Sequence, residues 1–223
     1  MPQQGGTHIS HKNGVTKERI LDEAEALFAK SGYHAVSVRE ITTSAECNLA
    51  AVNYHFGNKQ NLYLEVFRSR WLPRAKNLYR NFRTSHQAQG NPSPTTVVQS
   101  LAQAFLEGSM TEKERARHLQ LICGELVQPT EAFELVTGQV LRPLFNNLMA
   151  DLRGVMPDVP DEEQLALNAF SILAMVLYFN FARHLIISVL GVNNGNEFKT
   201  RLINHIVQFS LNGIRAGEEE VRK

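Results

Sequence analysis

A short stretch of the sequence places side chains that can read a DNA duplex on successive positions. Asn48 precedes a run of helix-forming residues, so it can begin a helix whose amino-terminal end meets a phosphate. Leu49, Ala50 and Ala51 offer methyl groups of the kind that contact the methyl of thymine, and Asn53 can form a bidentate contact with adenine. This pattern predicts a helix that enters the major groove.

Two further helices are needed to hold such a short recognition helix. Ser37 with Glu40 three residues later is typical of a capping box, and it predicts a helix over residues 38–44. A second helix follows at residues 49–54, after a turn that contains Glu46 and Cys47. An amphipathic helix over residues 16–31, with Gly32 as its left-handed stop, supplies the apolar face that closes a small core. The sequence therefore predicts a three-helix domain with a helix-turn-helix.

This region resembles the DNA-binding domain of the TetR family of bacterial transcriptional regulators. About 55 residues carry the resemblance: the first helix to Phe28 and Gly32-Tyr33, the segment 37–41, the segment 51–56, and Asn58-Lys59. The resemblance implies that Arg39 can read guanine and that Tyr54, His55 and Lys59 contact the DNA backbone. Val52 and Phe56 are predicted to pack in the core instead.

Two positions differ from the usual family pattern. Glu46 stands where glycine is usual, so a left-handed backbone there would cost about 1 kcal/mol. Asn53 stands where tyrosine is more frequent, so its contact is expected to differ from the usual one.

Charge is distributed unevenly along a chain whose net charge is only +1. Residues 1–85 contain 12 Lys and Arg against 7 Asp and Glu, whereas residues 86–223 contain 11 against 15. The amino-terminal part is therefore at +5 and the remainder at −4. A basic part that coincides with the helix-turn-helix is expected of a phosphate-binding module.

The two cysteines indicate neither a disulfide framework nor a metal site. Cys47 and Cys123 form no CxxC or Cys/His spacing, so we expect no zinc and no other cofactor. Residues 1–15 are polar and lack the apolar core of a signal peptide. The sequence thus predicts a mobile amino-terminal tail and a cytoplasmic location.

A long helix is expected to connect the DNA-binding domain to a second domain. It begins after Asn58, extends to about Arg83, and should bend at Pro73. A loop rich in glycine and proline follows at residues 84–95. The predicted division is a tail at 1–15, the helix-turn-helix domain at 16–60, a connecting helix at 61–85, and a ligand-binding and dimerisation domain at 86–223.

The second domain is also predicted to be helical. Helices are expected at 96–109, at 112–127, at 130–152 with a kink at Pro143, from Asp161 onward, and at 198–214 before a frayed end. The run 169–179 is apolar on all sides, which predicts burial on every side. A membrane span is the alternative, but polar residues interrupt the run after about 11 residues, short of the roughly 20 that are required.

The segment 121–213 resembles the ligand domain of the CecR-like TetR subgroup, through Glu125-Leu126, Pro129, the segment 142–145 and the segment 181–183. The resemblance implies a homodimer formed by the last two long helices and a pocket for a small effector among the middle helices. Polar groups within apolar helical runs need a partner, which is more often another side chain or the dimer partner, and a bound ligand is the alternative. The predicted ligand-binding residues are His118, Glu125, Gln128, Tyr178 and Arg183.

We therefore predict an all-α homodimeric regulator that binds operator DNA as a repressor and is released by a small apolar or amphipathic molecule. The sequence shows no nucleophile with its base, paired acid and base, metal cluster or phosphate loop at a recognisable spacing, so we expect no enzyme. An all-helical adaptor that binds only protein is the alternative. It would explain the long helices but not the basic, small-residue recognition surface.

Overall fold

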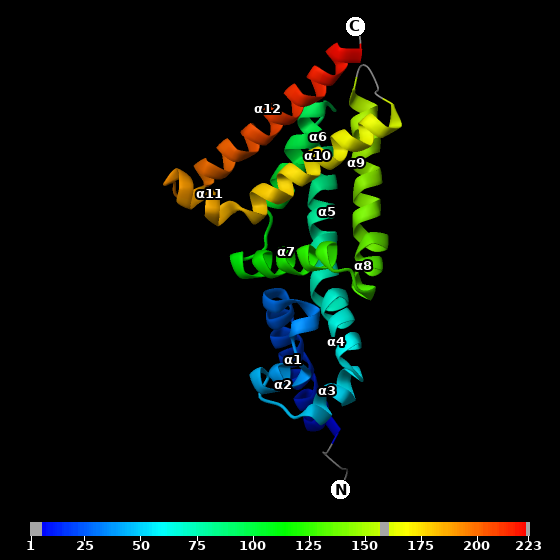
Figure 1. The fold of residues 1–223 in the computed structure, drawn as a ribbon, viewed down its shortest axis with the longest axis vertical. Coiled ribbons are helices and arrows are strands. Elements are labelled where there is room, and N and C mark those ends of the chain that lie inside the picture. Colours follow the sequence, from blue (N-terminus) through cyan, green and yellow to red (C-terminus); the bar gives the residue numbers. More distant parts are fainter. Residues whose placement is uncertain (1–5, 157–160, 222–223) are drawn as a thin grey trace. The chain divides into compact units, whose positions relative to one another are not determined.

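The computed structural model describes the backbone of residues 6–156 and 161–221, and the side chains of residues 14–156 and 161–214. Every regular element in these ranges is helical, which confirms the prediction of an all-α chain (Figure 1). The elements are α1 Gly6–Ala35, α2 Val38–Ser44, α3 Leu49–Phe56, α4 Lys59–Val66, η1 Phe67–Trp71, α5 Leu72–Ala88, α6 Pro94–Leu106, α7 Glu112–Val127, α8 Glu131–Val136, η2 Thr137–Leu141, α9 Arg142–Val155, α10 Glu162–Phe181, α11 Arg183–Leu190 and α12 Asn196–Val221.

Helix α1 is longer than predicted at its amino-terminal end. It begins at Gly6, so residues 6–15 are helical rather than a mobile tail, while residues 1–5 lie outside the described part. Extending an existing helix costs less than nucleating a new one, which explains how polar residues can continue it. At the other end Gly32 interrupts the helix with φ of 79° and ψ of 167°, so the predicted stop has the positive φ of a left-handed residue but not its ψ.

Each of the two mid-helix prolines follows a π-helical turn. Pro73 lies two residues beyond η1 and Pro143 lies two residues beyond η2. A proline cannot donate a bond to the carbonyl four residues earlier, and its ring crowds that turn. A wider turn accommodates both constraints, so a π turn precedes each proline at which a bend or kink was predicted.

The chain forms two compact units that do not follow the linear order. One contains the described residues up to Arg74 together with Met110–Thr137; the other contains Ala75–Ser109 and the described residues from Gly138 onward. Helix α7, which the sequence assigns to the second domain, thus packs on α1 within the first unit. The predicted functional boundaries stay a prediction.

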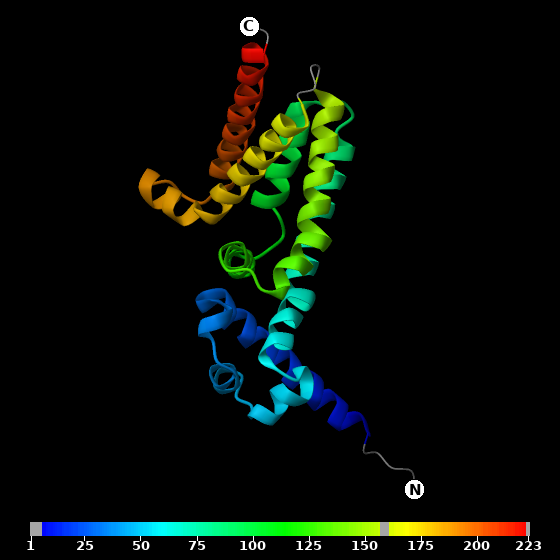
Figure 2. The same cartoon turned by 45° about the vertical axis from the view of Figure 1, so that its right-hand side comes forward.

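The first unit is built around α1. Helices α2, α3, α4 and α7 all pack on α1 (Figures 1 and 2). Ile20, Leu21 and Phe28 of α1 are buried, and so are Ile41 of α2 and Val52 of α3. These three apolar positions of α1 recur at helical spacing, as the sequence predicts. The packed face of α1 fixes α2 and α3 and leaves the other side of α3 open.

The second unit has its core between α6, α9, α10 and α12. Leu101, Leu148, Ile172 and Ile206 are buried there, one from each helix. Helix α12 lies along α6, and α10 packs on α6, α9 and α12 (Figure 2). All residues that the structure describes in this core belong to the second unit.

Some helix ends and one burial prediction differ from the sequence analysis. Helix α5 continues to Ala88 into the predicted loop, and α12 continues to Val221 through part of the predicted frayed end. Helix α10 is not buried on every side, because Phe170, Tyr178 and Phe181 are more than half exposed. Its 20 residues are long and apolar enough to cross a membrane by length and composition, a test that core helices of globular proteins also pass.

Candidate nucleic-acid interface

The turn between α2 and α3 closes as a Schellman motif. The N–H of Cys47 donates to the carbonyl of Thr42 at 3.0 Å, and the N–H of Glu46 donates to the carbonyl of Thr43 at 3.2 Å. Glu46 has φ of 46°, in the region that favours glycine. The expected backbone strain of about 1 kcal/mol is therefore present in the turn that positions the recognition helix.

Both short helices begin with the predicted caps. The Ser37 N–H donates to Glu40 Oε2 at 2.7 Å, and the Glu40 N–H donates to Ser37 Oγ at 3.2 Å. The hydrogen bonds from Ser37 lower the pKa of the Glu40 carboxyl. At the start of α3, Asn48 Oδ1 accepts from the N–H of Ala51 at 2.9 Å, so the amide of Asn48 acts as a helix cap.

Helix α3 has one anchored face and one open face. Val52 is fully buried and Phe56 nearly so, which confirms their predicted packing role. On the open side Tyr54 is 75% exposed and Leu49 is 50% exposed, with Ala50 and Asn53 also exposed. Four of the residues predicted to read DNA thus share one accessible surface.

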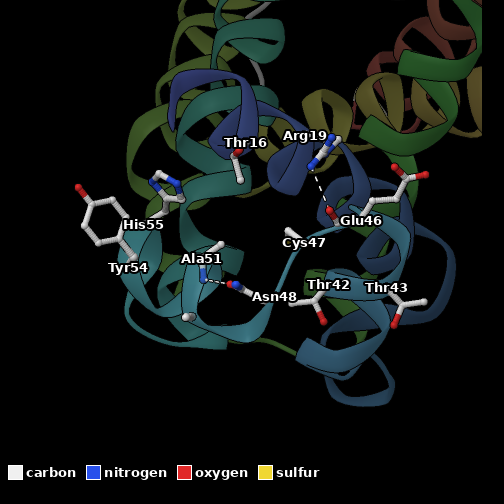
Figure 3. Close-up of a pocket in the computed structure, with 11 residues that line it drawn as sticks. Thr16, Arg19, Thr42, Thr43, Glu46, Cys47, Asn48, Ala51, Tyr54 and His55 are labelled. Atoms are coloured by element: carbon white, nitrogen blue, oxygen red, sulfur yellow. Dashed lines mark hydrogen bonds between the residues drawn. The ribbon is translucent and has the colours of Figure 1, made fainter. Parts of the chain in front are cut away.

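An open concavity of about 760 Å³ lies beside this surface, between α1, the end of α2 and α3 (Figure 3). Most of the residues that line it are polar or small. The predicted DNA contacts Asn48, Ala50, Ala51, Tyr54 and His55 line it, together with Thr16, Arg19, Thr42, Thr43, Glu46 and Cys47. Arg19 and the turn residues were not among the predicted contacts, because their proximity to α3 depends on the tertiary fold.

The remaining predicted DNA contacts lie outside that concavity. Arg39 is exposed on α2. Lys59 is half-buried, with its Nζ 4.4 Å from the centroid of the Tyr33 ring and 3.5 Å from the carbonyl oxygen of His34. Burial lowers the pKa of the Lys59 amine. A phosphate contact by Lys59 would therefore compete with its contact to Tyr33.

Several arginines of the basic amino-terminal part are engaged within the first unit. Arg70 pairs with Glu18 and Asp22, and Arg74 pairs with Glu25. Glu25 is only 1% exposed, and its other oxygen lies 3.3 Å from Arg117 of α7. These charges hold α1, η1, the first turn of α5 and α7 together, so they account for part of the basic excess without any role at DNA.

Glu125, a predicted ligand contact, has its hydrogen-bond partners inside the first unit. Glu125 is 1% exposed, and its carboxylate accepts from Tyr63 Oη at 2.7 Å and from the N–H of Thr130 at 2.9 Å. Burial and the bond to Glu125 raise the pKa of the Tyr63 phenol. The carboxylate therefore joins α4 to the start of α8.

His118, another predicted ligand contact, stacks on Trp71 with ring centroids 4.5 Å apart. The indole N–H of Trp71 donates to the carbonyl of His118 at 3.0 Å. Burial, assisted by the charge of Arg74, lowers the pKa of the imidazole to about 3. His118 is thus a neutral core side chain, and its buried Nδ1 has no partner within the described residues.

The other three predicted ligand contacts differ in their surroundings. Gln128 is exposed at the end of α7 in the first unit, and Tyr178 is 59% exposed on α10 in the second. Arg183 is buried and donates to the carbonyl of Leu106 at 3.1 Å. The ligand-binding role of all five residues stays a prediction.

The second unit contains buried polar atoms that the described residues leave unpartnered. Asn180 Oδ1 on α10 and Ser210 Oγ on α12 have no hydrogen bond there, and each residue is 6% exposed. Such an atom costs about 1 to 3 kcal/mol unless another group reaches it. Exposed apolar side chains occur on the same helices, including Phe181 and Phe209. Within the described residues, no group of three or more His, Cys, Asp or Glu side chains could hold a metal.

Two family matches cover most of the chain. The family described as "HTH-type transcriptional dual regulator CecR, C-terminal domain" matches residues 94–214, more than half of the sequence. The family described as "Bacterial regulatory proteins, tetR family" matches residues 20–66. The match at residues 20–66 overlaps the region of the first sequence resemblance, and the match at residues 94–214 contains the segment 121–213 of the second and begins 27 residues before it.

Full-length relatives and solved structures agree with these matches. The HTH-type transcriptional dual regulator CecR of Shigella flexneri is 26% identical over 217 residues, which cover 92% of this chain and 94% of that protein. The HTH-type transcriptional repressor NicS of Pseudomonas putida is 24% identical over 213 residues, which cover 90% of this chain and 92% of that protein. A TetR-family regulator from Bordetella parapertussis has a similar fold, with a TM-score of 0.64 at 18% identity, covering 87% of this chain and 93% of that one.

Proposed function

The chain belongs to the TetR family of transcriptional regulators, with a C-terminal domain of the CecR type, and from this membership we propose that it is a ligand-responsive repressor of transcription. The observation that supports DNA reading most directly is the two-sided helix α3. Val52 and Phe56 anchor it, while Leu49, Asn53 and Tyr54 remain open. A bacterial regulator of this kind acts in the cytoplasm.

Each protomer places α3 in a major groove, with Asn53 contacting a base and Lys59 contacting a phosphate. A dimer then reads two half-sites about one helical turn, or a multiple of it, apart. Binding in this way blocks access to a promoter.

Two copies associate through the exposed apolar surface of α10 and α12. Phe181 is 56% exposed and Phe209 is 61% exposed. Covering such side chains with the same helices of a second copy removes them from water, at roughly 25 cal/mol for each Å² buried. The homodimer fixes the separation of the two recognition helices.

The effector is a small apolar or amphipathic molecule that binds within the second domain. The unpartnered oxygens of Asn180 and Ser210 support this, because a ligand with a polar end would satisfy groups that the described chain leaves unbonded. An effector that prefers the conformation unable to span two half-sites releases DNA by population shift.

The test begins with duplexes selected from a random library by the purified protein and then sequenced. We expect a palindromic consensus and affinity that falls steeply with salt. Asn53→Ala should relax the preference at one base pair, whereas Lys59→Ala should weaken binding to all duplexes alike. Equal losses on every sequence for both variants would contradict the assignment, and absence of duplex binding would favour the adaptor.

The effector is then sought among small apolar and amphipathic compounds by their ability to release the selected duplex. A compound that releases DNA should also raise the thermal stability of the free protein, because it binds the folded state. Asn180→Leu and Ser210→Ala should each weaken that release while leaving affinity for DNA unchanged.

A further inference from the structure

Arg19 connects the first helix to the turn of the helix-turn-helix. Its Nη2 donates to the carbonyl oxygen of Glu46 at 3.1 Å, across 27 positions of sequence (Figure 3). Arg19 is exposed on α1 and lines the concavity beside α3. The side chain therefore touches the turn and faces the open side of the DNA-binding surface.

The bond is made to the one described residue other than glycine that has a positive φ. The N–H groups of Glu46 and Cys47 are used by the carbonyls of Thr43 and Thr42 in the Schellman motif. Arg19 satisfies the outward carbonyl of Glu46 and so fixes the orientation of the strained peptide. Because α3 begins only three residues later, a change in this peptide would move the recognition helix.

The guanidinium has donors beyond the one that the turn uses. Arginine carries five N–H groups in a planar fork, which suits bidentate contact with a phosphate. Asn48, at the amino-terminal end of α3, lines the same concavity as Arg19. A phosphate there would meet a guanidinium from α1 and the positive end of the α3 dipole.

We propose that Arg19 positions the recognition turn through the Glu46 carbonyl and at the same time binds a backbone phosphate of the duplex that α3 reads. This inference rests on the proposed DNA-binding function and adds a contact that the sequence did not reveal. Glu46 contributes its backbone carbonyl, which accepts the hydrogen bond from Arg19. Its exposed carboxylate is negatively charged and repels the same phosphate.

The phosphate contact is tested by the salt dependence of binding to the duplex selected by the wild-type protein. Between about 50 and 200 mM KCl, Arg19→Gln should reduce the slope of log affinity against log salt by about 0.9, the value for one phosphate. It should weaken selected and scrambled duplexes by a similar factor, roughly tenfold in low salt. Arg19→Lys keeps the charge and should retain the wild-type slope. Lys30→Gln is the matched control, since Lys30 is an exposed cation of α1 that does not line the concavity.

The positioning role is tested by combining Arg19→Gln with Glu46→Gly. Glycine removes the strain at the positive φ, so we expect Glu46→Gly to raise Tm and to cancel most of the Tm loss caused by Arg19→Gln. The lost salt slope should persist in the double variant, because glycine supplies no cation.

The outcomes separate the parts of the inference. A wild-type slope in Arg19→Gln overturns the phosphate contact. An unchanged Tm in Arg19→Gln, or no rescue by Glu46→Gly, overturns the positioning role. If the wild-type protein itself lacks salt-dependent duplex binding, the proposed function fails before Arg19 is tested.

Discussion

In the first unit the buried carboxylates of Glu25 and Glu125 have partners from the same chain, whereas in the second unit Asn180 Oδ1 and Ser210 Oγ have none within the described residues. The second unit also exposes large apolar side chains on α10 and α12. The first unit also leaves His118 Nδ1 and Thr137 Oγ1 without a partner among the described residues, so the contrast between the units concerns their buried carboxylates and the oxygens of α10 and α12. On α10 and α12 the second unit combines buried oxygens that have no described partner with large exposed apolar side chains, and the proposed dimer partner and effector would cover groups of these two kinds.

The largest effect should come from breaking the internal ion pairs of the first unit. Glu25→Ala leaves Arg74 and Arg117 without their shared buried carboxylate, so we expect the free energy of unfolding to fall by about 3 kcal/mol. Urea denaturation measures this loss. If Glu25→Ala does not fold, Glu25→Gln provides the same comparison with less loss of packing.

Glu18→Ala is the matched control for Glu25, because its carboxylate also pairs with an arginine but is 61% exposed. An exposed pair contributes only about 0 to 1 kcal/mol. Equal losses for the two variants would show that burial does not set the importance of these pairs.

The corresponding test of the second unit concerns its apolar surface. Phe181→Glu should weaken dimerisation by about 100-fold or more, because it places a charge where a second copy would cover the ring. Analytical ultracentrifugation over a range of concentrations measures the change. Leu126→Glu, at the same 56% exposure but in the first unit, should leave the dimer intact. A monomeric wild-type protein would overturn the contrast between the units.

His118 should make the first unit sensitive to acid. Its folded pKa of about 3 lies below the value of about 6.5 for an unfolded imidazole, so between these values the unfolded chain binds the proton more strongly. Stability is therefore complete above about pH 6.5 and falls as the pH decreases towards 3. We expect a loss of roughly 2 kcal/mol between pH 7 and 5 by urea denaturation. His118→Phe keeps a ring beside Trp71 but has no group that titrates, so its free energy of unfolding should fall less between pH 7 and 5. Parallel pH profiles of stability for the variant and the wild type would contradict this explanation.

The smallest effect is expected at Tyr63, whose hydroxyl donates to Glu125. Tyr63→Phe should lower the free energy of unfolding by about 1 to 2 kcal/mol, because Thr130 continues to satisfy the carboxylate in part. Tyr54→Phe is the control for stability, since the phenol of Tyr54 is on the exposed face of α3. A stabilised Tyr63→Phe variant would show that the buried carboxylate does not need this donor.

Local signals in the sequence predicted local structure well. Ser37 and Glu40 set the start of α2, Asn48 set the start of α3, and the observed α7 has its predicted bounds at Glu112 and Val127. Capping and apolar spacing act over a few residues, so they can be read without tertiary information.

Features that depend on distant partners could not be predicted in the same way. Glu125 was predicted to contact a ligand because its partner Tyr63 lies 62 positions away in the sequence. Arg19 was not predicted to act at the turn because the Glu46 carbonyl lies 27 positions away. The all-round apolar pattern of α10 predicted complete burial, yet a pattern cannot tell whether the same chain or a second copy provides the cover.

The π turns at the two prolines have a consequence for the long helices that contain them. The chain passes from one unit to the other after Arg74, after Ser109 and after Thr137. The crossing after Arg74 directly follows η1 and Pro73, and the crossing after Thr137 lies within η2. One extra residue in a turn rotates all later side chains by about 100° around the helix axis. In each of these helices the apolar residues therefore face a different side after the π turn than before it. A single repeating pattern of apolar positions cannot describe such a helix over its whole length.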